Sequence, residues 1–416
     1  MTTHDPASTP SERAFSYPSY RYFWTTICAA SFAAQIMSVS VGWQVYDITR
    51  NPFFLGLVGL AQFLPALVLV LITGLTADKF SRQRIMQISL AVEIGCSLVL
   101  LSFASISGAH EVWPIYLVLI TLGTARAFIG PAGSSLAPNL VPAPALSNAV
   151  AMNATAWQLA TIVGPVAGGL LYGVSPWLAY GVAAALVVAA LISVSMIKAP
   201  VQKPHDQETS ITTLLAGFRY IWGEKVVLGA ISLDLFAVLM GGAVALMPVF
   251  ARDILETGPW GLGLLRAAPG VGAIATALFL SRFPVRDHAG VTLFIFVAGF
   301  GFFTMLFGLS ASIWFSVPLL ALIGACDMVS VSIRETIMQL WTPDSVRGRV
   351  NAVNSVFIGA SNELGEFRAG MMATVIGASA AVALGGAATV AVAGIWSQIF
   401  PGIRKQRTLD KAMVEG

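Results

Sequence analysis

Charged residues are scarce in this chain, which has 416 residues, of which 23 are Lys or Arg and 20 are Asp or Glu. A soluble protein of this length would carry about 100 charged side chains. This shortage excludes a soluble enzyme and a disordered regulator, and a net charge of +3 is too small to indicate a nucleic acid partner. With 56% hydrophobic residues and a mean hydropathy of +0.80, the composition predicts a membrane protein.

Motifs for catalysis and cofactor binding are absent as well. No Lys is followed by Ser or Thr, so the chain has no Walker A loop for ATP, and it contains neither H-E-x-x-H nor G-x-S-x-G. The four His residues lie in expected tails or loops, and the three cysteines, Cys28, Cys96 and Cys326, lie in apolar runs. We therefore expect no enzyme activity, no cofactor, no metal site and no disulfide framework.

Twelve apolar runs dominate the rest of the chain, and each is long enough to cross a bilayer as an α-helix. We expect no cleaved signal peptide, because the first run follows a polar stretch and is too long for a leader. The expected spans are 22–46, 53–77, 85–107, 113–135, 148–172, 176–197, 226–250, 260–281, 290–310, 313–335, 350–376 and 380–400.

Basic residues are distributed unevenly between the two sides of these spans. If the N-terminus is cytoplasmic, 17 of the 23 Lys and Arg residues lie on the cytoplasmic side, and only Arg50 and Arg252 lie in outer loops. Positive residues are enriched on the cytoplasmic side of bilayers. The distribution therefore predicts a multi-pass protein of the cytoplasmic (inner) membrane, with both termini in the cytoplasm.

The longest polar stretch, 198–225, divides the chain into two groups of six spans. Its second part carries apolar residues at helical spacing, which predicts a short helix on the inner face of the membrane. We expect an all-α membrane protein whose twelve helices form two pseudo-symmetric six-helix bundles. The expected parts are an N-terminal tail at 1–21, a bundle at 22–197, a linker at 198–225, a second bundle at 226–400 and a C-terminal tail at 401–416.

An internal repeat supports this division. An ungapped shift of 201 residues aligns residues with special backbone or packing roles, while overall identity stays low. The aligned pairs are Trp113 with Trp314, Gly123 with Gly324, Pro142 with Pro343, Asn153 with Asn354, Gly164 with Gly365, and Gly169 with Gly370. Parallel repeats are one transporter architecture, with substrate bound near the midplane between them. The alternative is that apolar helices have converged on these matches.

The loop between the second and third spans carries the first recognisable motif. The segment from Gly74 through Asp78 to Arg82 and Arg84 resembles the signature loop of the major facilitator superfamily, although Ser81 stands where that family prefers Gly. The resemblance implies a twelve-helix transporter in which this loop latches the two halves in the outward-facing state. The alternative is a generic basic loop at the membrane surface.

A second motif lies in the fifth span. Gly164, Pro165, Gly168 and Gly169 resemble a superfamily motif associated with exporters, so the resemblance implies outward transport. Small residues four apart let two helix backbones approach closely, and a proline inside a helix removes one hydrogen bond and kinks it. Helix packing is therefore expected whatever the direction of transport.

A third motif is centred on Arg126 in the fourth span. A mid-membrane arginine costs at least about 3 kcal/mol and needs partners or water. Leu122, Arg126 and Gly130 resemble the motif of proton antiporters in the superfamily, although Ile129 replaces its glutamine. The resemblance implies a role for Arg126 in proton coupling. The alternative is a structural arginine satisfied by backbone carbonyls.

The repeat carries Arg126 onto Asp327, so equivalent positions of spans 4 and 10 bear opposite charges. In the superfamily, spans 1, 4, 7 and 10 line the central cavity, and spans 7 and 1 contain Asp234 and Gln35. We expect Arg126, Asp234 and Asp327 to face that cavity, and protonation of either acid in the outward-open state to couple transport. Glu363 in span 11 is expected either to pair within the bundle or to take part in coupling.

The remaining charged residues in the spans are expected to have other roles. Glu93 in span 3 and Arg266 in span 8 are expected to be mainly structural. Arg334 lies near the cytoplasmic end of span 10, where a long basic side chain reaches the membrane interface.

One branch of the superfamily is similar over most of the chain. Segments 126–132, 140–149 and 343–352 look like corresponding loops and spans of the branch that contains enterobactin-type siderophore exporters and macrolide or multidrug efflux proteins. The resemblance implies a proton-driven antiporter that exports a medium-sized amphipathic compound and acts as a monomer in the bilayer. The alternatives are a nutrient uptake transporter and, from another class, a non-transporting membrane receptor or assembly factor.

Overall fold

The computed structural model describes residues 12–105, 111–198, 211–285 and 288–404, and these residues form helices and turns with no strand. The α-helices are α1 (Pro18–Thr49), α2 (Pro52–Lys79), α3 (Arg82–Ser105), α4 (Trp113–Leu136), α5 (Leu146–Val174), α6 (Pro176–Ser195), α7 (Ile211–Gly223), α8 (Lys225–Gly241), α9 (Met247–Val249), α10 (Gly258–Arg282), α11 (Ala289–Gly308), α12 (Ile313–Trp341), α13 (Asp344–Ile376), α14 (Ala378–Ile399) and α15 (Pro401–Arg404). Shorter segments are the 3-10 turns η1 (Ala14–Ser16), η2 (Ala137–Asn139), η3 (Ala143–Ala145) and η4 (Val244–Leu246), and the π-helical η5 (Phe250–Ile254).

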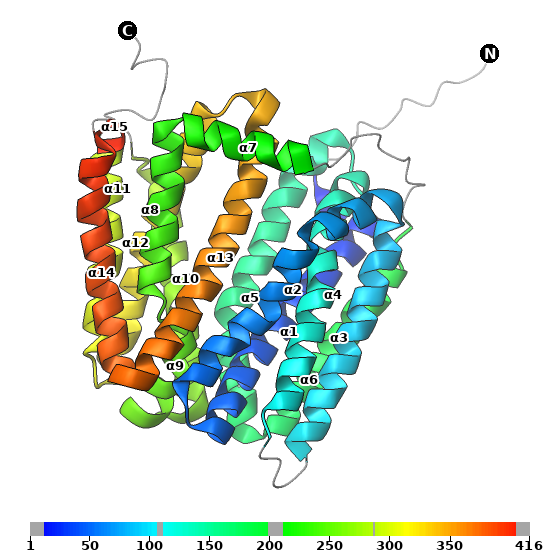
Figure 1. Cartoon of the computed structure of the whole chain (residues 1–416). Helices are drawn as coiled ribbons and strands as arrows, with labels where there is room; N and C mark the ends of the chain where they lie inside the picture. The colour runs from blue at the N-terminus through cyan, green and yellow to red at the C-terminus, as the bar shows by residue number, and fades with distance from the viewer. Residues whose placement is uncertain (1–11, 106–110, 199–210, 286–287, 405–416) are drawn as a thin grey trace, which may run out of the picture.

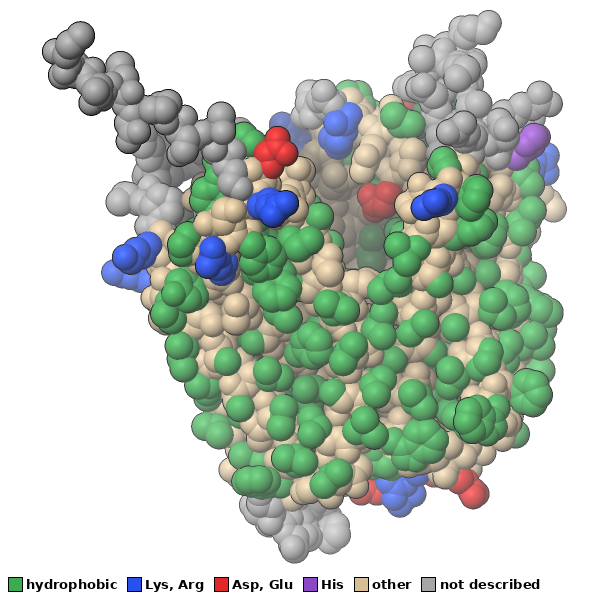
Figure 2. Space-filling model, turned by 180° about the vertical axis from the view of Figure 1, so that it is seen from behind, with side chains coloured by type: hydrophobic (Ala, Val, Ile, Leu, Met, Phe, Trp, Pro, Cys, Tyr) green, Lys and Arg blue, Asp and Glu red, His purple; other side chains and the backbone are tan. Residues whose placement is uncertain are grey.

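The expected membrane protein is confirmed by the helices themselves. In the described part of the chain, eleven candidate spans are long and apolar enough to cross a bilayer. The twelfth long helix, α13, has 33 residues but a lower hydropathy, because it carries several charged side chains, among them Glu363, Glu366 and Arg368. On the face seen in Figure 2, hydrophobic side chains cover the middle of the molecule and charged side chains gather at its two ends. The eleven spans together with α13 are consistent with the expected twelve crossing helices.

Prolines mark where several of these helices begin. A proline in the first turn loses no hydrogen bond, because that N–H has no partner within the helix. Such prolines occur at the starts of five long helices, namely Pro18, Pro52, Pro114, Pro176 and Pro259. At α2, the Asn51 side chain also accepts a hydrogen bond from the backbone N–H of Phe53, at 3.0 Å, and so caps the helix.

The helices form two bundles that lie side by side, with α1–α6 in the first and α8–α14 in the second (Figure 1). Within the first bundle α1 packs against α5 and α6, while α2 and α3 pack against α4. In the second, α11 packs against α12 and α14, and α10 packs against α12. The two main contacts between the bundles are α5 with α10 and α13 with α2.

Repeat-related glycines lie at both of these contacts between the bundles. A Cβ atom at Gly169 of α5 would lie 3.1 Å from the Cα of Gly263 in α10, and one at Gly370 of α13 would lie 3.0 Å from the Cα of Gly56 in α2. Only glycine lets two helix backbones approach this closely. The shift of 201 residues thus relates residues that make the same kind of contact in the two bundles.

The seventh span is confirmed as a crossing segment, but it is not the single continuous helix expected over 226–250. Helix α8 ends at Gly241, and η4, α9 and η5 complete the span. A Cβ atom at Gly242 would lie 2.7 Å from the carbonyl carbon of Gly365 in α13, so α13 packs directly on the interrupted backbone. Glycine tolerates both the break and this close approach.

Helices α7 and α15 lie at one end of the molecule, and α9 lies at the opposite end (Figure 1). We call these the α7 end and the α9 end. The helix expected in the polar stretch is confirmed, and the Tyr220 hydroxyl donates a hydrogen bond to the carbonyl of Trp341, at 2.5 Å. A Cβ atom at Gly217 would lie 2.8 Å from the carbonyl oxygen of Arg349, so α7 is fixed to the start of α13.

Candidate functional site

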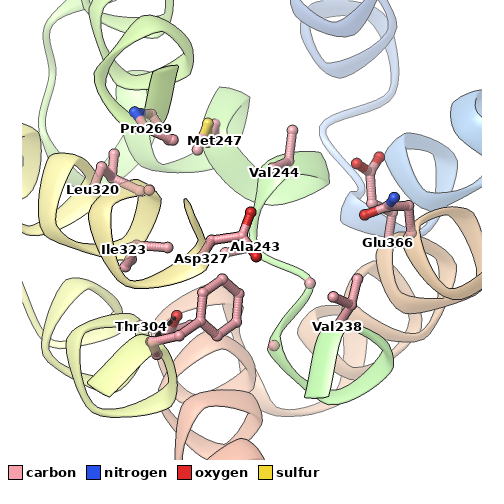
Figure 3. Close-up of a pocket in the computed structure, with 15 residues that line it drawn as sticks. Val238, Ala243, Val244, Met247, Pro269, Thr304, Leu320, Ile323, Asp327 and Glu366 are labelled. Carbon is pink, nitrogen blue, oxygen red and sulfur yellow. Dashed lines mark hydrogen bonds between the residues drawn. The ribbon is translucent and has the colours of Figure 1, made fainter. Parts of the chain in front are cut away.

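A cavity within the second bundle is the centre of the candidate site. Residues of α8, α10, α11, α12 and α13 line it, and it offers about 190 Å³ to the centres of water-sized molecules. A buried water needs only about 10–15 Å³ on that measure, so the cavity exceeds a water site. Its walls are mostly apolar, and the polar side chains are Thr304, Asp327, Asn362 and Glu366. Asp327 and Glu366 lie on opposite sides of the cavity (Figure 3).

Asp327 and Asp234 lie near each other, as expected, but in different environments. Both line a smaller pocket beside the cavity. Asp234 is buried and forms an ion pair with Arg334, 2.5 Å between Oδ2 and Nη1. Among the described residues, Asp327 has neither an ion pair nor a hydrogen bond. Asp327 is therefore the acid of this pair that remains open to a ligand or a proton.

The buried position of Arg334 corrects our expectation that it reaches the membrane interface. Its side chain is 8% exposed. The carboxylate of Asp234 compensates the charge inside the bundle, so the side chain has no need to extend to water. The sequence could not show this pairing, because the two residues are 100 positions apart.

Arg126 lies in the first bundle, away from this cavity. Its Nε donates to Oε1 of Glu93 at 3.0 Å, and Nη1 donates to Oε1 of Gln62 at 3.2 Å. Arg126 is not among the described residues that line the cavity of Asp327, and the expectation that Arg126, Asp234 and Asp327 all face one central cavity stays a prediction. A carboxylate and an amide accept from Nε and Nη1, in place of the backbone carbonyls of the structural alternative, while Nη2 is buried without a hydrogen-bond partner.

Glu363 and Glu366 of α13 lie where the two bundles meet. Oε2 of Glu363 is buried without a hydrogen bond and would clash with any Cβ at Gly59 of α2. Arg266 of α10 reaches the first bundle, where its Nη1 donates to the hydroxyl of Ser38 at 2.6 Å. Glu363 is thus close to the cavity but faces the interface between the bundles, and Glu366 lines the cavity itself.

Arg368, the next charged residue of α13, has a structural role. Its Nε donates to the carbonyl of Leu239 at 2.9 Å, and Nη2 donates to the carbonyl of Met240. Carbonyls in the last turn of a helix lack partners within that helix, and a cation there also interacts favourably with the helix dipole. Arg368 therefore stabilises the end of α8 at the break beside the cavity.

The glycines of the fifth span pack α5 against two neighbours. A Cβ atom at Gly164 would lie 2.6 Å from Cβ of Gln35 in α1, and one at Gly168 would lie 3.0 Å from Cα of Ile36. Gln35 is therefore a packing partner of the motif in this structure. Pro165 is buried between α5 and α10, where its carbonyl oxygen would lie 2.6 Å from a Cβ at Gly263.

The signature loop lies at the α7 end, between α2 and α3. Nη1 of Arg82 donates to the carbonyl of Ser135, at 2.7 Å, which ties the loop to the end of α4 in the first bundle. Arg84 is exposed, and Gly74 is half-buried in α2. The side chain of Asp78 lies outside the described residues.

An ionic cluster at the α9 end joins the two bundles, and our reading of the sequence missed it. Asp47 of α1 pairs with Arg252 of η5, at 2.5 Å, and Arg50 pairs with Asp253, at 3.8 Å. The Tyr46 hydroxyl also donates to the Asp253 carboxylate. A signal was available, because the two basic residues of the outer loops, Arg50 and Arg252, each lie near an aspartate after corresponding spans.

Comparisons with known proteins agree with this architecture. Residues 11–413 match the family described as "Transmembrane secretion effector". The chain is 26% identical over 344 residues to enterobactin exporters EntS from Shigella boydii serotype 4 (strain Sb227) and from Escherichia coli O1:K1 / APEC, with 81% of each chain covered.

Solved structures of transporters share the fold. A bacterial homolog of the human lysosomal transporter Spinster, in an inward-facing and unoccupied conformation, superposes with a TM-score of 0.72 at 14% identity, covering 95% of this chain and 97% of the other. A bacterial homologue of the iron transporter ferroportin, in an inward-facing state, gives 0.69 at 13% identity, covering 93% and 99%. The chain therefore belongs to the transmembrane secretion effector family of the major facilitator superfamily and is a multi-pass membrane transporter.

Proposed function

We propose that this transporter is a proton-driven antiporter that exports a medium-sized amphipathic compound by alternating access. The observation that carries the proposal is Asp327, a carboxylate without an ion pair or hydrogen bond in the described structure, on the wall of a mostly apolar cavity. An unpaired acid at membrane depth is costly unless it binds a ligand or a proton. During proton-driven transport, Asp327 would bind a proton in one state and the substrate in the other.

The proposed orientation places both termini in the cytoplasm and the protein in the inner membrane. The uneven distribution of basic residues supports this orientation. The molecule is hollowed at the α7 end, with an acidic side chain visible inside the hollow (Figure 2). At the α9 end, Asp47 and Arg252 hold the bundles together. On this orientation the structure is the inward-facing state, open to a cytoplasmic substrate.

The moving units are proposed to be the bundles at 22–197 and 226–400, connected by the linker at 198–225. In the outward-facing state, the loop with Gly74, Asp78, Arg82 and Arg84 is proposed to latch the α7 end. The bundles are already in contact through backbone at Gly169 and Gly370, so they can rock as rigid bodies about these contacts. One chain contains both bundles and the cavity, which is why we propose a monomer.

Proton coupling is assigned first to Asp327. In the outward-facing state the acid takes a proton, and in the inward-facing state it releases the proton and is free for substrate. Asp234 has a second role, because protonation would break its pair with Arg334 and loosen α8 from α12. Arg126 with Glu93 is a separate candidate in the first bundle.

Export is favoured over uptake by the motif of the fifth span and by the relatives, which are named as enterobactin exporters. The substrate is proposed to be a siderophore or a drug. The test is the accumulation of a labelled catecholate siderophore and a labelled macrolide in cells with and without the protein, each with and without a protonophore.

Export predicts lower accumulation of one compound in cells that make the protein, and loss of that difference with the protonophore or with Asp327→Asn. Glu256→Gln is the matched control, because Glu256 is an exposed acid outside the cavity. Higher accumulation with the protein would instead indicate uptake. Equal accumulation of both compounds under all conditions would contradict export of either.

A further inference from the structure

We propose that the cavity of the second bundle selects an amphipathic cation, such as a compound with a protonated or quaternary amine on an apolar body. This proposal rests on the proposed function, since it names the class of substrate that the cavity takes. Three features support this class of substrate: the apolar walls, the two carboxylates of the lining, and the excess of acidic over basic groups around the cavity.

The walls fit an apolar body. Phe300, Leu320 and Ile323 line one part of the cavity, and Val244 and Met247 line another. Ligand pockets are mostly apolar, with a few polar groups that fix the orientation of the ligand. Methionine adapts its shape to different ligands, which suits a binding surface for compounds of varied outline.

The charges on the walls have one sign. Asp327 and Glu366 are the charged residues of the lining, and none of its described residues is Lys, Arg or His. Ionised carboxylates only accept hydrogen bonds, so the ligand has to supply donors or a positive charge. A phenyl face from Phe300 beside Asp327 adds to the attraction for a cation.

Basic residues close to the cavity offset only part of this acidic charge. Arg334 forms its ion pair with Asp234, and Arg368 binds the carbonyls of Leu239 and Met240. Arg266 donates to Ser38 of the first bundle and also interacts electrostatically with Glu366 and Glu363. None of these three guanidinium groups belongs to the described lining of the cavity. Two of them, Arg334 and Arg266, interact with four acids, Asp234, Asp327, Glu363 and Glu366, so the surroundings of the cavity keep an excess of acidic groups.

A third carboxylate strengthens the negative potential on the α13 side. Glu363 lies one turn before Glu366, and its Oε2 is buried without a hydrogen bond. Acidic groups with few compensating cations, in surroundings of low dielectric constant, attract a cation more strongly than they would in water. The same field opposes an anion, so a deprotonated catecholate siderophore is disfavoured, and an amine-bearing drug is favoured.

Two probes of the same size and shape test the sign of charge. Labelled tetraphenylphosphonium, a cation, and labelled tetraphenylborate, an anion, are dialysed against the full chain in lipid nanodiscs, with empty nanodiscs subtracted. We expect tetraphenylphosphonium to bind more tightly than tetraphenylborate. Loss of a close charge partner predicts at least about a tenfold weaker binding of the cation by Asp327→Asn or Glu366→Gln.

Two further variants keep this test decisive. Asp327→Glu retains the charge and should retain selectivity for the cation, and Glu256→Gln, with its acid outside the cavity, should bind both probes as the unmodified chain does. Size-exclusion chromatography checks that each variant is folded. Tighter binding of tetraphenylborate, or unchanged cation binding in both Asp327→Asn and Glu366→Gln, would overturn the proposal.

Measuring binding and transport separately distinguishes failure of the cationic substrate from failure of the proposed export. Export of a siderophore without selective cation binding would contradict the cationic substrate and leave export intact. Selective cation binding that depends on Asp327, with no transport of any compound in cells, would support the cation site and contradict the exporter.

Discussion

Single charged residues in the spans differ mainly in what compensates them. Arg126 has Glu93, and Asp234 has Arg334, whereas Asp327 has no such partner among the described residues. Compensated pairs hold helices together, because removing one member leaves the other charge in a medium of low dielectric constant. The uncompensated acid on the cavity wall is therefore the residue most suited to bind substrate or a proton.

The ion pair between Arg126 and Glu93 allows a structural role of Arg126 to be distinguished from a role in proton coupling. Breaking a buried pair costs about 3–5 kcal/mol, whereas replacing both charges is close to neutral. We predict that Glu93→Gln lowers the unfolding temperature, and that Glu93→Gln with Arg126→Gln restores it. Thermal unfolding of the purified variants measures this. Equal unfolding temperatures for the single and double variants would show that the pair does not stabilise the fold.

Transport by the same double variant decides the second role of Arg126. If the arginine is only structural, transport returns together with stability. If it takes part in proton coupling, a stable double variant has lost proton-dependent transport. The accumulation assay distinguishes these outcomes, with Glu256→Gln as the reference variant.

An arginine in the middle of the membrane is costly, so the sequence alone predicted that Arg126 needs a partner. The sequence could not identify that partner as Glu93, because Glu93 lies 33 residues earlier in another helix. The repeat placed Arg126 and Asp327 at equivalent positions, but it could not show that Arg126 binds Glu93 and Gln62 while Asp327 lines a cavity in the other bundle. The sequence indicated Asp327 as a candidate because the repeat aligns it with Arg126 and because an acid within an apolar span is costly. The position of Glu366 on the cavity wall could not be predicted, because it depends on how α13 packs on α8.

At the scale of elements, small residues determine which helices approach each other. Helix α5 uses Gly164 against α1 and Gly169 against α10, and α13 makes the related contacts with α8 and α2. The spacing of these glycines predicted close packing, but not the partner helices. The Gly241–Gly242 pair that interrupts the seventh span was visible in the sequence, although hydropathy alone predicted one continuous run.

Two glycines of α5 offer a matched pair for this packing. A Cβ atom at Gly169 would lie 3.1 Å from the Cα and the backbone nitrogen of Gly263, whereas one at Gly173 would meet nothing within 4 Å. We predict that Gly169→Ala destabilises the structure by about 1–3 kcal/mol. Gly173→Ala should be neutral or slightly stabilising, because alanine favours helix. Thermal unfolding and transport rates measure both, and equal behaviour would contradict this role of Gly169.

At the scale of the whole molecule, the two ends are closed to different extents. The α9 end is held by Asp47 with Arg252 and Arg50 with Asp253, and by the guanidinium of Arg252 over the ring of Trp43, 5.3 Å from its centre. The α7 end is hollowed (Figure 2). Pairs that exist in only one conformation bias the equilibrium between conformations by their own free energy.

Removing one of these pairs should open the α9 end. Partly exposed ion pairs contribute about 0.2–1 kcal/mol, so Arg252→Gln or Asp47→Asn should increase the fraction open at the α9 end by a factor of roughly 1.4 to 5. Electron paramagnetic resonance between spin labels at Ser175 and Ala311, which lie in turns of different bundles, measures the separation. An unchanged distance distribution in both variants would show that the cluster does not hold this end closed.

Proton-driven export through the cavity is tested most directly in everted membrane vesicles, whose outer face is the cytoplasmic one. With an acidic lumen, labelled macrolide should accumulate inside vesicles that contain the chain. Accumulation should disappear with a protonophore and with Asp327→Asn, and should persist with Glu256→Gln. Accumulation that withstands the protonophore, or that is as fast with Asp327→Asn as with the unmodified chain, would contradict this mechanism.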